Sequence, residues 1–427
     1  MRADPGPLPT AATGTGVSRD PAAPALRSIV VLGLLSTFGP LSLDLYLPAL
    51  PELAEELAST PSAAQLTITA CLVGLAVGQL VAGPLSDRFG RRPPLLVGLV
   101  AYLLASVACA FAPSVAALVG LRLVQGLAGA AGLVVARAVA RDLYEGRRLV
   151  VFFARLTLIS GLAPVVAPVL GGQLSRVMSW RGIFGVLAGI GAVLLVAGLT
   201  QRETLPPERR STGGLTSTLR GFRVLLHDRF FVGAALSSGL ASASMFAYIS
   251  GATFVLQRIH GLSASSFSLV FGVNSVGIMA MSQLAARLNR RWTPVRVLGL
   301  GLALNLVGAT ALAATVLLGL GLPFLVGSLF VMVAALGLVF PTATALAMAD
   351  HPEQAGTASS LLGLGQFVFG ALVAPLVGIA GERTAVPLGL VAFVASTCGS
   401  LAFVSLVLPS ARAARGGEVL PEAPPAG

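Results

Sequence analysis

The sequence predicts an all-α integral membrane protein with twelve transmembrane helices. Hydrophobic residues make up 55% of its 427 positions, charged residues only 11%, and the mean hydropathy is +0.88. Soluble domains carry roughly 25% charged residues, and a water-soluble fold could not bury so much apolar surface. We therefore expect lipid to be the solvent for most of the chain.

Long segments without Asp, Glu, Lys or Arg give the second observation. A spanning helix needs roughly 20 apolar residues, because ~30 Å of hydrocarbon is crossed at ~1.5 Å per residue. Val297–Ala349 is long enough for two spans, with a turn expected at Gly321-Leu322-Pro323. The other charge-free runs are Leu57–Ser86, Pro93–Leu121, Phe230–Gln257, Ile259–Ala286 and Thr384–Ala411.

Taken in order, the apolar segments predict the individual spans. We expect them at residues 27–48, 63–86, 94–112, 115–140, 150–175, 182–200, 229–256, 265–287, 295–318, 322–348, 356–380 and 385–409. An even number of spans places both termini on the same side of the membrane.

Arginine supplies all 28 basic residues, and its distribution predicts the orientation. With the N-terminus inside, twenty-one arginines fall in inside segments and four in outside loops, while three lie within spans. This bias indicates cytoplasmic termini. The formal charge of +11 therefore reflects the orientation of the chain in the membrane, and we expect no nucleic acid partner.

The hydrophilic segments predict the domain organisation. Residues 1–26 and 410–427, rich in Pro, Ala and Gly, are expected to be disordered cytoplasmic tails. Residues 201–228 contain Pro206-Pro207 and five arginines, which is typical of a cytoplasmic linker. It would join six-helix bundles at 27–200 and 229–409.

Internal similarity supports two related halves. Ala167-Pro168-Val169-Leu170-Gly171 in the fifth span matches Ala374-Pro375-Leu376-Val377-Gly378 in the eleventh. Two related halves around a central cavity are typical of transporters. Cys71, Cys109 and Cys398 all sit in apolar segments, so we expect neither disulfide nor metal site. No nucleotide-binding motif or catalytic constellation is found, so we expect no cofactor and no enzyme.

The loop after the second span carries the most specific motif. It reads GPLSDRFGRRPPL, Gly83–Leu95, and resembles the signature of the major facilitator superfamily. The resemblance implies a loop that latches the two halves in the outward-open state; alternatively, its arginines only set topology. The latch residues would be Gly83, Asp87, Arg88, Gly90, Arg91 and Arg92.

Two further motifs are similar to the drug/proton antiporter branch of that family. The fourth span reads RLVQGLAGAAG from Arg122, and the fifth reads GLAPVVAPVLGG, with Ala167 where Gly is usual. Closely spaced small residues and prolines would give a kinked helix with two packing arrangements, although they are also compatible with ordinary packing. The residues of the fifth-span motif are Gly161, Pro164, Pro168, Gly171 and Gly172.

The narrowest resemblance is to the bicyclomycin/chloramphenicol resistance subfamily. It rests on Leu43–Pro51 in the first span, and on Ala355–Gly363 with Gln366 in the eleventh. It implies proton-driven efflux of small drug-like molecules across a bacterial inner or plasma membrane, by a monomer. Proton-coupled export or import of a metabolite through the same fold stays open, and a sensor or channel is less favoured.

Placing an ionisable side chain inside a membrane span costs free energy, so we interpret such residues as functional unless another role is evident. Asp44 lies about 16 residues into the first span, and Arg122 about 18 residues before the cytoplasmic end of the fourth. At ~1.5 Å per residue these depths agree within one helical turn. We therefore predict that Asp44 takes up and releases the proton, with Arg122 as modulator. Alternatively, Asp44 is solvated, or is a helix-breaking cue before Pro48.

The substrate surface is expected to be an apolar cavity with a few polar groups. For each candidate, ordinary packing is an equal alternative. The candidates are Tyr46, Gln125, Met245, Phe246, Tyr248, Asn274, Asn305 and Gln366.

Overall fold

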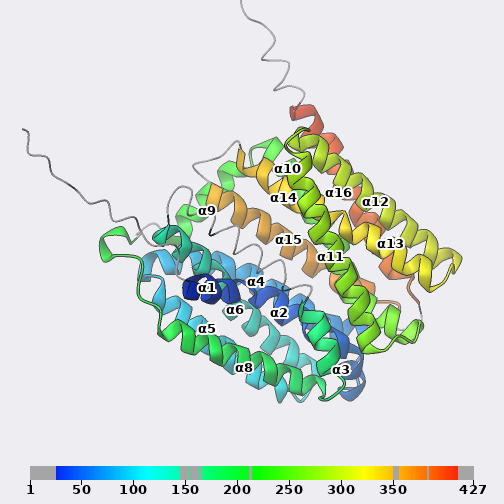
Figure 1. Ribbon diagram of the computed structural model, residues 1–427, viewed down its shortest axis with the longest axis horizontal. Helices are drawn as coiled ribbons and strands as arrows, with labels where there is room; N and C mark the ends of the chain where they lie inside the picture. Colours follow the sequence, from blue (N-terminus) through cyan, green and yellow to red (C-terminus); the bar gives the residue numbers. More distant parts are fainter. Residues whose placement is uncertain are drawn as a thin grey trace, which may run out of the picture.

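The computed structural model describes residues 26–144, 152, 163, 166–210, 214–349, 355–381 and 384–411. Over these residues the chain forms α-, 3-10 and π-helices and no strand (Figure 1). The all-helical fold class predicted from composition is thereby confirmed. The two parts of the chain that flank residues 211–213 form two groups of helices, called here the first and the second group.

The first group is built on four long helices. They are α4 (Pro61–Phe89), α5 (Arg92–Ala110), α6 (Val115–Leu143) and α8 (Trp180–Leu199). Helix α6 packs against α4 and α5, and α5 also packs against α8. Predicted spans two, three, four and six therefore form helices close to their expected positions.

The first predicted span, 27–48, is not one straight helix. It consists of α1 (Leu26–Ser36), α2 (Phe38–Asp44), a 3-10 turn (Leu47–Ala49) and α3 (Leu50–Glu56). The axis bends by 50° between the segments 30–36 and 41–56.

Prolines explain why this span is broken and why it continues beyond residue 48. Pro48 and Pro51 each sit in the first turn of the segment that they open. A proline fits there because the first N–H groups of a helix have no intrahelical acceptor, whereas the same ring disrupts a helix interior. The chain therefore restarts as a helix after each break.

The second group contains α10 (Arg229–Phe254), which continues as a π-helix over Val255–Ile259. Gly319 and Gly321 adopt positive φ angles of 65° and 88°, which forms the turn expected at residues 321–323. The remaining helices are α11 (Ala264–Leu288), α12 (Pro294–Leu318), α13 (Leu322–Ala334), α14 (Leu336–Ala349), α15 (Ala355–Val377) and α16 (Val386–Ala402), extended by a π-helix over Phe403–Val407.

Ten helices of the described chain are long and apolar enough to span a membrane, and the bent first segment makes an eleventh candidate. The fifth predicted span, 150–175, lies mostly outside the described residues. Its described part, 166–174, is helical.

The expected linker, 201–228, contains a helix that the sequence reading did not anticipate. Helix α9 (Gly214–Leu225) contacts both α4 and α15. Phe222 and Leu225 are buried, whereas Arg220 and Arg223 are exposed. Figure 1 shows α9 and α3 at opposite ends of the molecule, which are called here the α9 end and the α3 end.

Glycines allow α4 and α6 to approach closely. A Cβ added to Gly126 of α6 would overlap the carbonyl oxygen of Cys71, and one on Gly74 of α4 would overlap that of Leu123. Small residues at such crossings are what brings helix backbones together in a membrane. This seam makes the first group a closely packed unit.

Candidate functional site

Asp44 lies at the break of the first span. It is the last residue of α2 and is 5% exposed. Its carboxylate makes no hydrogen bond or ion pair with any other described residue. An acid buried without a fixed partner inside a membrane segment is the arrangement expected of a group that changes its protonation state.

Arg122, on α6, is fully buried close to that break. Its guanidinium donates to the carbonyl oxygen of Ser42 at 2.8 Å and to the side-chain oxygen of Gln125. It also lies over the rings of Tyr46, at 4.6 Å, and Phe184, at 5.6 Å. The faces of these two rings thus contact the positive charge of Arg122, as a carboxylate would in an ion pair.

Asp44 and Arg122 are not ion-paired in this conformation. The guanidinium binds the backbone two residues before Asp44 and does not bind its carboxylate. The structure therefore places both predicted residues at the same break, while their direct pairing stays a prediction for another conformation.

Arg122 is supported by a buried polar chain that begins with Gln125, a predicted cavity residue, and continues through residues that were not predicted. The Gln125 amide donates to Ser106 Oγ at 2.7 Å, and Ser106 donates to the carbonyl oxygen of Tyr102 at 2.7 Å. The Tyr102 hydroxyl is bonded to Ser42 Oγ at 2.7 Å. Serines are common in spans as back-bonding residues, so nothing in the local sequence singles these out.

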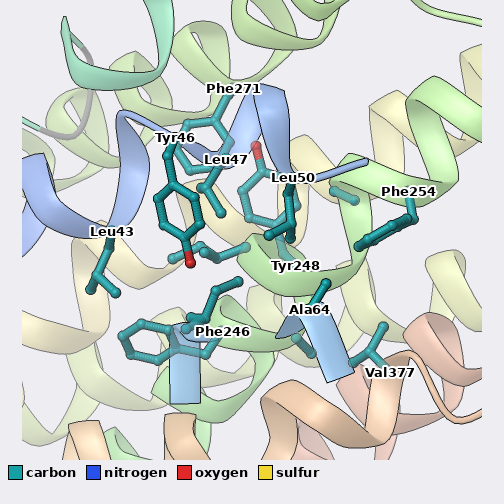
Figure 2. Packing of buried hydrophobic residues seen from close by; sticks show 14 of the residues in the cluster. Leu43, Tyr46, Leu47, Leu50, Ala64, Phe246, Tyr248, Phe254, Phe271 and Val377 are labelled. Atoms are coloured by element: carbon teal, nitrogen blue, oxygen red, sulfur yellow. The ribbon is translucent and has the colours of Figure 1, made fainter. Parts of the chain in front are cut away.

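On the side of the second group, Tyr248 of α10 packs at the same break. Its phenol accepts a 2.9 Å hydrogen bond from Asn274 Nδ2, and its ring stacks on Phe271 with 5.1 Å between centroids. Figure 2 shows Tyr46 and Tyr248 within one apolar cluster to which both groups contribute. Asn274 Oδ1 is buried and has no partner among the described residues.

The other cavity candidates are distributed differently. Phe246 belongs to the same cluster and packs on Phe367 at 6.4 Å. Met245 and Gln366 are half-buried. Asn305 is fixed inside the second group, because its amide donates to Met332 O at 2.9 Å and to Ser244 at 3.2 Å.

Hydrogen bonds join the two groups at the α3 end. Arg258 forms a 2.5 Å ion pair with Glu55 and donates to the carbonyl oxygen of Pro51 at 3.2 Å. Gln257 donates to that of Pro48 at 3.1 Å. These contacts connect the C-terminal part of the broken first span to the π-helix that follows α10.

Side chains of α4 extend this connection towards the middle of the molecule. The Gln65 amide donates to Ser250 O at 3.0 Å, and the Ser62 hydroxyl donates to Pro375 O at 3.1 Å. The two groups are therefore closed against each other at the α3 end.

The predicted latch loop lies at the other end of α4. Arg91 forms an i,i+4 ion pair with Asp87, donates to Ser86 Oγ at 3.0 Å, and pairs with Asp142 of α6 at 2.8 Å. Gly90 has φ = 93°, which disfavours other residues.

The remaining latch residues are placed less tightly. Gly83 lies in the last two turns of α4 with Val134 nearby. Arg88 is exposed over the ring of Phe89, and Arg92 is exposed and donates to Leu199 O at 3.0 Å.

Glu203, at the start of the expected linker, completes this loop and was missed by the sequence reading. Its carboxylate accepts the backbone N–H groups of Arg91 at 2.8 Å and Arg92 at 3.0 Å, and those of Thr204 and Leu205. Partial burial alone would raise the pKa of Glu203, but the four N–H groups outweigh it and hold the pKa below its ordinary value.

The fifth-span motif is described only in part. Gly161 and Pro164 lie outside the described residues, and Pro168 is in the helical stretch 166–174. A Cβ on Gly171 would overlap the Leu45 carbonyl oxygen beside Asp44, and one on Gly172 would overlap Ser268 of α11. Adjacent glycines thus face the first-span break and the second group.

Comparison with known proteins agrees with this architecture. The chain is 40% identical over 379 residues to the uncharacterized MFS-type transporter YdgK of Bacillus subtilis, covering 88% of this chain and 94% of that protein. It is 33% identical over 364 residues to the bicyclomycin resistance protein homolog of Haemophilus influenzae, covering 84% and 91%.

A solved structure shares the fold. That of the nucleoside transporter NupG superposes with a TM-score of 0.72 at 13% identity, covering 89% of this chain and 98% of that one. The profile of the Major Facilitator Superfamily matches residues 32–375. The chain therefore belongs to the major facilitator superfamily and is a multi-pass membrane transporter, not an enzyme.

Proposed function

We propose that this protein exports small drug-like molecules in exchange for protons, by alternating access. Bicyclomycin-type compounds are the first candidates because of the Haemophilus influenzae relative. Chloramphenicol-type compounds follow from the resemblance of the first and eleventh spans.

Coupling of transport to protons is supported by the burial of Asp44 at the break of the first span. Its carboxylate is held by no fixed cation among the described residues, so a proton is the simplest means of neutralising it in a low-dielectric setting. Arg122 keeps its charge throughout, because a guanidinium does not give up its proton in proteins. It would stabilise the ionised form whenever the two approach each other.

The direction of transport depends on which end of the protein lies in the cytoplasm. We place the α9 end in the cytoplasm because the arginine-rich segments lie there, with six-helix bundles at 27–200 and 229–409 as the moving bodies. The bonds at the α3 end would then close the outer side of this conformation. A reporter fused to the C-terminus tests the orientation, since a periplasm-active reporter would stay silent.

Export from everted vesicles with an imposed pH gradient tests the function. Wild-type protein should move bicyclomycin or chloramphenicol only with the gradient, and Asp44→Asn should lose the gradient-driven part. Glu208→Gln removes a carboxylate from an exposed turn and should transport normally.

Two results would contradict the proposal. Full gradient-driven transport by Asp44→Asn would place the proton site elsewhere. Gradient-driven movement of sugars or amino acid derivatives, with no movement of either drug, would favour the metabolite transporter.

A further inference from the structure

Pro375 lies inside α15, shortly before this helix ends at Val377. A proline within a helix has no N–H to donate, so the carbonyl oxygen of the residue four positions earlier loses its partner in the helix. That oxygen belongs to Ala371, which is 6% exposed. A buried carbonyl without a donor costs free energy inside a membrane, and a hydroxyl from a neighbouring helix can satisfy it.

A hydroxyl from the other group of helices supplies this donor. Helix α4 of the first group packs along α15 of the second group (Figure 1). The hydroxyl of Thr69, on α4, donates to the carbonyl oxygen of Ala371 with 3.2 Å between the two oxygens. The carbonyl that the proline frees is therefore satisfied across the interface that alternating access would open.

Two more side chains of α4 bind the backbone of the second group in the same manner. Ser62, Gln65 and Thr69 are three and four positions apart, so they lie in one row along the helix. Ser62 donates to the carbonyl oxygen of Pro375, and Gln65 donates to that of Ser250 on α10. The Pro375 carbonyl is among the last four of α15, which have no donor in the regular helical pattern. The row thus binds carbonyl oxygens that a proline or a helix end leaves available.

The related Ala-Pro-x-x-Gly segment of the fifth span makes a similar contact with α11. A Cβ on Gly378, after Pro375, would overlap Oε1 of Gln65, and one on Gly172 would overlap Oγ of Ser268. These added atoms would also lie 2.7 Å and 2.9 Å from backbone atoms of α4 and α11. Each group therefore presents a helix end that contains proline and glycine to the start of a helix in the other group.

We propose that the bond from Thr69 to the Ala371 carbonyl positions the two groups in the conformation that is closed at the α3 end. Pro375 makes the carbonyl available, and Thr69 is the positioning residue that donates to it when the groups are closed. When the α3 end opens, this oxygen exchanges Thr69 for water, because the proline ring occupies the place of the helical donor. This inference rests on the proposed function, in which the two groups move against each other.

The dependence on Pro375 distinguishes this role from ordinary packing. If residue 375 carried an N–H, the Ala371 carbonyl would be bonded within α15 in both conformations. Thr69 would then add only a second bond to an oxygen that is already satisfied. Removal of the Thr69 hydroxyl should therefore have a large effect when the proline is present and a small effect when it is absent.

Distances between spin labels on α3 and at the start of α11, in purified, lipid-reconstituted protein, test the proposal. Thr69→Val has nearly the same shape and lacks the hydroxyl. It should raise the ratio of open to closed conformers about fivefold, as expected for the loss of one neutral hydrogen bond. Thr69→Ser retains a hydroxyl and should behave as wild type. Thr397→Val is the matched control, because that hydroxyl donates to Phe393 of its own helix, α16.

The proline variant supplies the second comparison. Pro375→Ala restores an N–H for the Ala371 carbonyl and should itself favour the open conformers. In that background, Thr69→Val should change the ratio by less than about twofold, which is the coupling expected of two residues that act on the same oxygen.

An unchanged ratio in Thr69→Val would overturn the proposal. So would an equal effect of Thr69→Val with and without Pro375, or an equal shift in Thr397→Val. The measurement uses neither drug nor pH gradient, so its outcome is separate from that of the export assay. Failure of export together with an intact Thr69 effect would reject the exchange of drug for protons and retain the bond between the groups.

Discussion

Glu203 shows how one side chain organises a loop that three arginines dominate in the sequence. The first N–H groups of α5 have no acceptor within their helix, and a carboxylate there satisfies them and complements the helix dipole. Glu203 accepts two of them while Asp142 holds Arg91 from α6. The beginning of the linker is thereby attached to the predicted latch.

Substitution of Glu203 by Gln should destabilise the protein at neutral pH by about 1 kcal/mol, less than a buried charged bond, because this side chain is exposed. The folded-state pKa of Glu203 is lowered, so its contribution is complete above the ordinary glutamate pKa of about 4.3. That contribution is lost as the pH falls through the folded value.

Apparent melting temperatures in detergent at several pH values measure this effect. The difference between wild type and Glu203→Gln should shrink on acidification below about pH 4.3. A difference that stays constant with pH would contradict the assignment. Glu208→Gln is the matched control, since it removes a nearby carboxylate from an exposed turn.

A motif or an unusual position in the sequence marks some of the candidate residues. Asp44 and Arg122 are conspicuous as charges inside apolar segments, and both lie buried at the break. Glu203 could not be found in this way, because it is one acid in a hydrophilic stretch and its partner Arg91 is 112 positions away. Asn274 and Tyr248 were named as cavity candidates, but no sequence signal indicated that they bond to each other.

At the scale of the elements, the first span and the linker differ most from expectation. Depths along the first span were counted for a straight helix, and the prolines that break it made that count unreliable. Helix α9 was missed because the prolines, glycines and arginines of residues 201–228 dominate the composition of that stretch. Its buried Phe222 and Leu225, three positions apart, were the available signal.

The seam between α4 and α6 yields a prediction at this scale. Gly126→Ala should destabilise the protein by roughly 1–3 kcal/mol, because the added Cβ would overlap the Cys71 carbonyl and force the helices apart. Gly120→Ala makes the same change on the same helix, where nothing lies within 4 Å of the added atom. It should be neutral or slightly stabilising.

Thermal unfolding of both variants in one detergent measures the contrast. Equal behaviour of Gly126→Ala and Gly120→Ala would show that the seam adjusts freely.

For the whole molecule, the bonds at the α3 end determine which conformation is populated. Arg258→Ala removes the ion pair with Glu55 and the bond to Pro51, both of which connect the two groups. The side chains are partly exposed, so their loss is worth about 1 kcal/mol or less, and conformers open at the α3 end should increase up to about fivefold.

Distance distributions between spin labels on α3 and α11 report this population. Arg181→Ala is the control, because it removes a charge from the same end whose partners, Glu56 and the carbonyl oxygens of Ala110 and Ala112, lie in one group. A similar shift in both variants would mean that general charge, and not the bond between groups, determines the opening.

The close approach of helices at Gly126, Gly171 and Gly172 also has a consequence for how this protein can change over generations. Every single-base change in a glycine codon that encodes a different amino acid adds at least a Cβ, so even the smallest substitution at these positions fills space that a neighbouring helix occupies. The apolar side chains of the cluster around Phe246 have no such restriction, since one ring or aliphatic side chain can replace another there. We therefore expect laboratory selection for new substrates to find its mutations in that cluster and to leave the glycines unchanged.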